Sequence, residues 1–257
     1  MFSQLFHVVL YQPIFNIFVG LYDIIPGHDV GLVIVAITIL IRLAVYPLTK
    51  SSLAAQKSLQ VLQPKMEEIK KLYAKDQQKQ AQELMILYKS NKVNPLSSCL
   101  PLLIQLPILI ALYTVMRDGL ASHNLAASLY SFIPNPGTIN SLSLGHFDMT
   151  KSLWPLALLA GAAQYWQAKM MMSQRPPKAA GEGAKDEDMM AMMNKQMLYM
   201  MPAMTVLIGW KLPAGLALYW FFSTLLMGAQ QWYMFGKDKK SNNKNQISNP
   251  NIEIPKS

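Results

Sequence analysis

A single arginine lies inside a long apolar run of this sequence. Residues 30–50 read VGLVIVAITILIRLAVYPLTK, and Arg42 is the only charged residue before Lys50. At a rise of about 1.5 Å per residue, Arg42 would lie about 18 Å from one end of such a helix and about 12 Å from Lys50. A central arginine in a membrane-spanning helix costs roughly 2.5–3.5 kcal/mol, so the sequence predicts a hydrated cavity or a partner for it. The plainer alternative is an arginine near a membrane end that reaches the headgroups.

The polar residues of this run are spaced for one face of a helix. Thr38, Arg42, Tyr46 and Thr49 stand at i, i+4, i+8 and i+11, and this spacing places them on one side. The run is therefore predicted to carry a polar stripe that contains a fixed positive charge.

Three further apolar runs carry a polar residue near their middle. Gln105, Gln164 and Ser223 would lie at a depth similar to that of Arg42. If these faces converge, they form a hydrated groove with one positive charge. The alternative for each glutamine is an ordinary hydrogen bond between helices. Apart from Asp29 at the outer end of the first one, the predicted spans contain no Asp or Glu, so the counter-charge of Arg42 must come from lipid phosphate, a loop or an acidic segment of a client protein.

Motifs for other chemistry are missing from the sequence. It contains neither HExxH nor G-x-S-x-G, and it has no Gly-rich phosphate loop. The four histidines, at 7, 28, 123 and 146, are not at metal-ligand spacing. A single cysteine, Cys99, excludes an intramolecular disulfide. We therefore predict no catalysis, no metal and no cofactor.

The composition is that of a polytopic membrane protein. Of the 257 residues, 52% are hydrophobic, and the net charge is +9. The long apolar runs predict an all-α fold with five transmembrane helices. These predicted spans cover residues 29–50, 95–116, 152–173, 196–211 and 213–235. The segments rich in Lys and Arg alternate with poor ones, which predicts an outer N-terminus and a cytoplasmic C-terminus.

The remaining segments have distinct predicted roles. Residues 1–28 form an extracytoplasmic interfacial helix, interrupted by Pro13, in preference to a spanning helix. Residues 51–94 form a cytoplasmic helical hairpin, with Asp76 as the N-cap of its second helix. Residues 117–151 form an extracytoplasmic loop, 174–195 a cytoplasmic loop, and 236–257 a basic, disordered cytoplasmic tail. The N-terminus lacks the basic residues of a signal peptide.

Several short stretches, in order along the chain, resemble the YidC/Oxa/Alb family of membrane protein insertases. These stretches are IPGHD (25–29), YPLT (46–49), QP (63–64), MILYK (85–89), NPL (94–96), CLP (99–101), QLPI (105–108), PAGL (213–216) and LYW (218–220). Each is weak alone, but the ordered set covers most of the chain. Ser98 departs from the glycine that the family often has there. The large extracytoplasmic domain of longer bacterial members is missing, so the chain resembles a minimal bacterial form.

The resemblance implies a mechanism and a location. In a bacterial inner membrane, a groove open to the cytoplasm and to lipid would accept nascent membrane proteins. Arg42 would hold an acidic client tail, and Gln105 and Trp220 would line the groove. The expected partners are the ribosome, signal-recognition targeting factors and the Sec translocon, without direct nucleic-acid specificity. Two alternatives are a small transporter or channel and an assembly scaffold that does not insert clients.

Overall fold

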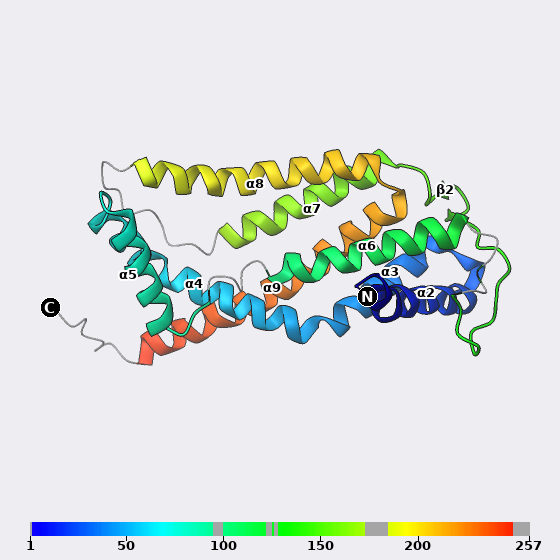
Figure 1. Cartoon of the computed structure of the whole chain (residues 1–257), viewed down its shortest axis with the longest axis horizontal. Helices are drawn as coiled ribbons and strands as arrows, with labels where there is room; N and C mark the ends of the chain where they lie inside the picture. Colours follow the sequence, from blue (N-terminus) through cyan, green and yellow to red (C-terminus); the bar gives the residue numbers. More distant parts are fainter. Residues whose placement is uncertain (1, 95–99, 122–124, 126–127, 173–184, 249–257) are drawn as a thin grey trace.

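The computed structural model describes residues 2–94, 100–121, 125, 128–172 and 185–248, and most of them are helical. This confirms the predicted helical class. Figure 1 shows an elongated molecule whose helices run mostly along its length. The elements are α1 (Phe2–Phe6), the π-helical η1 (His7–Tyr11), α2 (Gln12–Ile24), the 3₁₀ turn η2 (Pro26–His28), α3 (Val30–Ala44), α4 (Tyr46–Leu72), α5 (Gln77–Ser90), α6 (Leu100–Ala121), β1 (Leu142–Ser143), β2 (Phe147–Asp148), α7 (Trp154–Met172), α8 (Lys185–Lys211) and α9 (Ala214–Ser248).

Two parts of the described chain are long and apolar enough to cross a membrane. One is the helix Gln4–Ile24, and the other is the bent pair formed by Val30–Ala44 and Tyr46–Leu59. The first shows that Pro13 does not interrupt the N-terminal helix, contrary to prediction. Proline removes one hydrogen bond and its ring crowds the carbonyl four residues earlier. The wider π-helical turn of η1, directly before it, accommodates that defect.

The core lies where α2, α3, α6 and α9 meet. Phe18, Ile34 and Leu112 are fully buried there, and Leu216 is nearly so. Gly215, in the first turn of α9, leaves room for side chains of both neighbouring helices, because a Cβ at this position would collide with Met116 Cε on α6 and would lie 2.7 Å from Ile34 Cδ1 on α3. Small residues at such crossings let helix backbones pack tightly in membranes. A second group of helices is formed by α7, which packs against α8 and α9.

A bend of 63° separates α3 from the first part of α4. The break is at Val45, with φ −87° and ψ 0°. Pro47, in the first turn of α4, cannot donate a hydrogen bond and favours a kink before it. The predicted single helix over 29–50 is therefore wrong. Helix α4 instead runs without a break from Tyr46 through the predicted boundary at residue 51.

A helical hairpin follows, as predicted, in α4 and α5. Asp76 caps α5, because its Oδ1 accepts a hydrogen bond from the backbone N–H of Lys79 at 3.0 Å. Tyr88 Oη lies 3.7 Å from Met66 Sδ and joins the two helices. The hairpin lies at one end of the molecule, opposite α2 and the β1–β2 hairpin (Figure 1).

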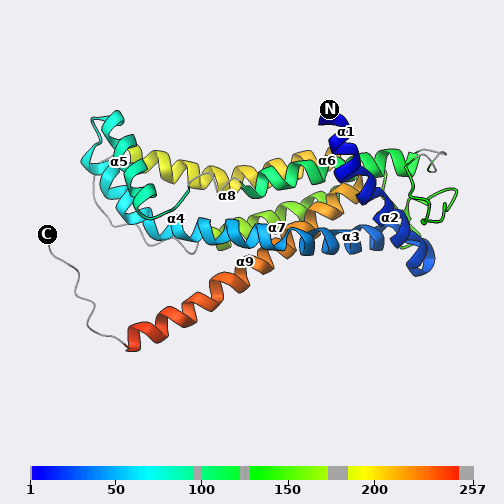
Figure 2. The same cartoon turned by 60° about the horizontal axis from the view of Figure 1, so that its bottom comes forward.

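Two segments predicted as irregular are helical. Residues 185–195 of the predicted loop belong to α8, and residues 236–248 of the predicted tail belong to α9. The acids at positions 186–188 favour the start of α8, and α9 meets no proline before Pro250. Figure 2 shows the last turns of α9 projecting away from the other helices. The rest of these two predictions, at 174–184 and 249–257, lies outside the described residues.

Candidate functional site

Arg42 lies in the last turn of α3 and points toward α9. Its Nε donates a hydrogen bond of 3.0 Å to Ser223 Oγ, and its Nη2 donates one of 2.5 Å to the same oxygen. Ser223 is almost fully buried. The aliphatic part of the arginine follows the apolar helix, while the guanidinium is held between helices.

The third helix of the site is α6, which contributes Gln105. The side-chain oxygen of Gln105 accepts a 3.3 Å hydrogen bond from Arg42 Nη2, and its Nε2 donates a 2.7 Å bond to Tyr219 Oη. Tyr219 is 1% exposed and stands one turn before Ser223 on α9. Gln105 therefore connects the arginine to the hydroxyl of a buried tyrosine.

All the hydrogen-bond partners of Arg42 within the described residues are neutral. Neutral acceptors orient a guanidinium without cancelling its charge. No described residue accepts a hydrogen bond from Nη1, so part of the fork of donors stays available. A carboxylate or phosphate is the group that best matches the fork of an arginine.

Helices α3–α4 and α9 run parallel and keep one register across the bend at Val45. Ile34 lies against Gly215, Arg42 bonds Ser223, and the hydroxyl of Thr49 lies 3.1 Å from Gln230 Oε1. Each pair is separated by 181 residues in the sequence. The polar side of this helix pair therefore extends two turns beyond Arg42.

The predicted site residues are only partly brought together. Arg42, Gln105 and Ser223 form one hydrogen-bonded cluster. Thr38 is fully buried and donates to the backbone oxygen of Ile34, its own turn.

The other three predicted residues have no hydrogen bond to Arg42 in the described structure. Tyr46 lies beyond the bend with 40% of its surface exposed, and its place in the polar stripe stays a prediction. Gln164 lies on α7, and Trp220 is half-buried on α9. Tyr219 was not predicted as a site residue, although its spacing of four from Ser223 places both on one helix face.

The end of the site away from the hairpin is covered by the loop 128–151. Asp29 caps α3 through the N–H of Leu32 at 3.0 Å and also accepts 2.8 Å from Ser143 Oγ and 2.5 Å from the N–H of Leu144. At the start of α9, Ala214 donates its N–H to the carbonyl of Lys151 at 2.8 Å. The loop is thus tied to the first turns of both helices that hold the arginine.

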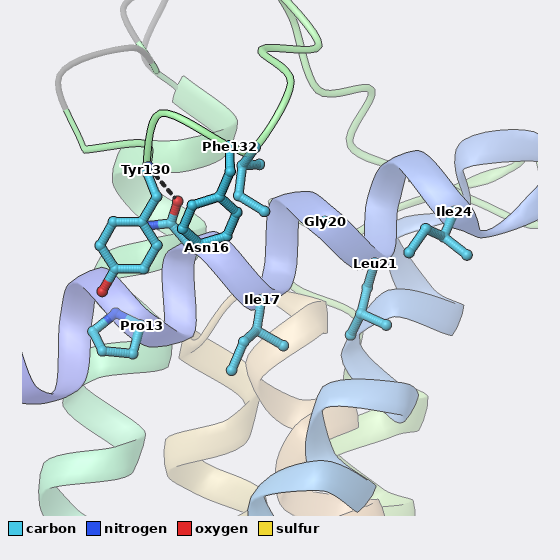
Figure 3. Close-up of a pocket in the computed structure, with 9 residues that line it drawn as sticks. Pro13, Asn16, Ile17, Gly20, Leu21, Ile24, Tyr130 and Phe132 are labelled. Carbon is cyan, nitrogen blue, oxygen red and sulfur yellow. Dashed lines mark hydrogen bonds between the residues drawn. The ribbon is translucent and has the colours of Figure 1, made fainter.

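The same loop is fixed to α2 through Asn16. Its Nδ2 donates a hydrogen bond of 2.9 Å to the carbonyl of Ser128. Its Oδ1 accepts one of 2.7 Å from the N–H of Tyr130, which Figure 3 shows. Beside this contact lies an apolar groove of about 370 Å³, lined among others by Ile17 and Phe132. Since the amide of Asn16 is paired on both sides, it braces the loop.

Charged groups in this loop are stabilised locally. Hydrogen bonds from the hydroxyl and N–H of Thr150, at 2.6 and 3.0 Å, lower the pKa of Asp148 from 3.8 to about 2. Lys151 Nζ adds an ion pair at 3.3 Å. Asp148 therefore stabilises the turn after β2 as a carboxylate.

These features define a class of protein: a helical membrane protein with an unneutralised arginine held between three helices, covered at one end and bearing a basic helical hairpin at the other. The model of the family described as 60Kd inner membrane protein matches residues 20–242, and the chain belongs to that family. Membership confirms the resemblance seen in the sequence.

Named relatives agree with this assignment. The chain is 35% identical to a Fusobacterium nucleatum protein named membrane protein insertase YidC, over 80% of this chain and 86% of that one. It is 38% identical to the Bacillus subtilis membrane protein insertase MisCA, over 85% of this chain and 75% of that one. A crystal structure of an active YidC insertase with its first transmembrane domain resolved matches with a TM-score of 0.57 and 28% identity, over 87% of this chain and 46% of that one.

Proposed function

We propose that this chain inserts integral membrane proteins into the bilayer and assists their folding. The observation that carries the proposal is the guanidinium of Arg42, which is held by neutral groups and keeps its charge inside an apolar helix bundle. The relatives bear the name of insertases, and the geometry supplies a physical basis for that activity. No enzymatic step is part of the proposal.

Arg42 would hold the acidic N-terminal segment of a client. A carboxylate can approach Nη1 while Ser223 and Gln105 keep the guanidinium in place. Because the described partners of Arg42 are neutral, a client carboxylate would not have to displace an internal carboxylate. Charge-assisted hydrogen bonds are about twice as strong as neutral ones, so Arg42 would hold a carboxylate more firmly than an uncharged polar side chain.

The client would enter a hydrated groove between α3, α6 and α9, open to the cytoplasm and to lipid. The loop 128–151 covers the opposite end through its bonds to Asp29 and to the start of α9. Thr38, Tyr46, Gln164 and Trp220 stay predictions as lining residues of this groove. Water in it would lower the cost of moving polar client residues partway across.

Two forces would drive insertion without a nucleotide. The apolar segment of the client partitions into lipid, and the membrane potential adds about 2.3 kcal/mol for each elementary charge moved across 100 mV. Acidic tails move outward in the favourable direction when the cytoplasm is negative.

We place the chain in a bacterial inner membrane with five spans, an outer N-terminus and a cytoplasmic C-terminus. The lysines of α4 and α5 and those at the end of α9 lie at the same end of the molecule (Figure 1), in keeping with the positive-inside rule. This basic end is the proposed binding surface for the ribosome, targeting factors and the Sec translocon.

Reconstitution tests the proposal. The purified chain in liposomes without a translocon receives a single-span client whose N-tail carries either aspartates or asparagines. We expect protease protection of the acidic tail and weaker protection of the neutral one. Protection equal to that in empty liposomes would contradict the insertase, and ion flux instead would favour a channel.

A further inference from the structure

A second polar contact joins α9 to α4, just beyond the bend that follows Arg42. Thr49 Oγ1 on α4 lies 3.1 Å from Oε1 and 3.1 Å from Nε2 of Gln230 on α9. Thr49 is buried, with 2% of its surface exposed, and Gln230 is half-buried. No charged group takes part in this contact, so it differs in chemistry from the arginine site.

The bond between Thr49 and Gln230 can open at little cost. The Thr49 hydroxyl also lies 2.9 Å from the carbonyl of Tyr46 and 3.2 Å from that of Val45. When Gln230 leaves, the hydroxyl can donate to these oxygens in its own turn. Gln230 then presents a free amide with both donors and an acceptor.

The neighbouring residue, Gln231, has a buried side-chain oxygen that accepts no hydrogen bond from the described residues. Gln231 as a whole is 2% exposed. Buried polar atoms are nearly always paired in folded proteins. The oxygen of Gln231 can therefore accept a hydrogen bond from a donor that reaches it.

The distance along α9 between Ser223, which binds Arg42, and Gln230 predicts the spacing of the client residues that could contact both sites. Gln230 follows Ser223 by seven residues, or about 10 Å of helix. An extended peptide covers about 10 Å in three residues. A client residue held by Arg42 would therefore be followed, three residues later, by a residue beside Gln230.

We propose that Gln230, exchanging from Thr49, is a second client-binding residue, which hydrogen-bonds the peptide backbone of the extended client segment about three residues after the acid held by Arg42. Gln231 supports this contact with its unpaired oxygen. The inference rests on the proposed insertase function and deepens it: Arg42 recognises charge, and the glutamines recognise an unfolded backbone of any sequence.

Site-directed crosslinking tests the proposed register. In a chain with Cys99→Ser, a cysteine is placed by Gln230→Cys or, as a control on the same helix, by Ala229→Cys at an exposed position. The client carries one acid and one cysteine, moved from three residues before the acid to six after it. We expect the strongest disulfide from Gln230→Cys at three residues after the acid, and none from Ala229→Cys.

Two further variants separate binding from a structural role. Gln230→Leu should lower the protected client fraction roughly three- to tenfold, the loss expected for one net hydrogen bond. Thr49→Val frees Gln230 and should leave insertion at or above the wild-type level. Equal damage from both variants would mean that the pair only joins the helices and would overturn the inference.

The outcomes are distinguishable from failure of the proposed function. A client that is protected by the wild-type chain but forms no position-dependent disulfide at 230 would overturn the second binding residue alone. A client that is not protected even by the wild-type chain would contradict the insertase itself, and the inference would fall with it.

Discussion

Ser223 Oγ accepts two hydrogen bonds from Arg42, at 3.0 Å from Nε and 2.5 Å from Nη2. One neutral oxygen therefore fixes one edge of the guanidinium and leaves its charge intact. A carboxylate in the same place would fix the arginine equally well but would neutralise it. The choice of a hydroxyl here is what keeps Arg42 available for an external acid.

The first prediction concerns this choice. Ser223→Asp should place an anion against Arg42 and abolish insertion of acidic-tailed clients, while pairing with the guanidinium offsets part of the cost of burying the new charge. Protease protection and thermal unfolding in detergent measure the two effects. Ser223→Thr keeps the hydroxyl and should retain most of the activity; an active Ser223→Asp protein would show that the charge of Arg42 is not used.

The second prediction concerns the bond between Gln105 and Tyr219. Gln105→Leu removes the 2.7 Å hydrogen bond that Gln105 Nε2 donates to Tyr219 Oη. Leaving a buried polar atom without such a bond lowers the free energy of unfolding by about 1–3 kcal/mol. Removing the hydroxyl as well, by Tyr219→Phe, should recover part of this loss. A double-mutant cycle on unfolding in detergent measures the coupling, and strictly additive losses would contradict a direct bond.

The third prediction concerns the covered end of the groove. A Cβ at Gly31 would lie 2.9 Å from Ser143 Cβ, so Gly31→Ala should push the β1–β2 hairpin away from α3. Overpacking of this kind costs about 1–3 kcal/mol, and limited proteolysis should cut the loop 128–151 faster. Ser143→Gly in the same chain should restore resistance, whereas Leu32→Ala, at an exposed neighbour, should have no effect.

The fourth prediction is a pH dependence of this loop. The folded pKa of Asp148 is lowered to about 2 from 3.8. Its stabilising contribution is therefore complete above about pH 4 and is lost as the pH falls toward 2. Unfolding temperatures of the wild type and Asp148→Asn should converge over that window, and a constant difference from pH 6 to pH 2 would contradict the assignment.

Much of this organisation could be predicted from local patterns. Apolar runs predicted helices, the lysine-rich amphipathic segment predicted the hairpin, and Asp76 predicted its cap. The depth and isolation of Arg42 predicted an unneutralised charge. These features depend on residues near one another in the chain, where periodicity and capping rules apply.

The features that could not be predicted from the sequence depend on how the helices pack against one another. To predict the kink at Val45 one must know that the crowding by Pro47 is relieved by a bend rather than within a straight helix. Similarly, the register that pairs Arg42 with Ser223 and Thr49 with Gln230 depends on how α3, α4 and α9 pack against one another. No periodicity within either helix contains that register, so the partnership with Tyr219 and the second polar contact emerge only in three dimensions.

The most direct test of the central claim is protease protection of an acidic client N-tail in translocon-free liposomes that contain the wild type, Arg42→Lys or Arg42→Ala. Arg117→Ala serves as a matched control, because Arg117 is exposed and paired with Asp118 at 2.7 Å. We predict protection by the wild type and the control, partial protection by Arg42→Lys, and loss of protection by a folded Arg42→Ala chain. Equal protection by Arg42→Ala and the wild type would contradict the account.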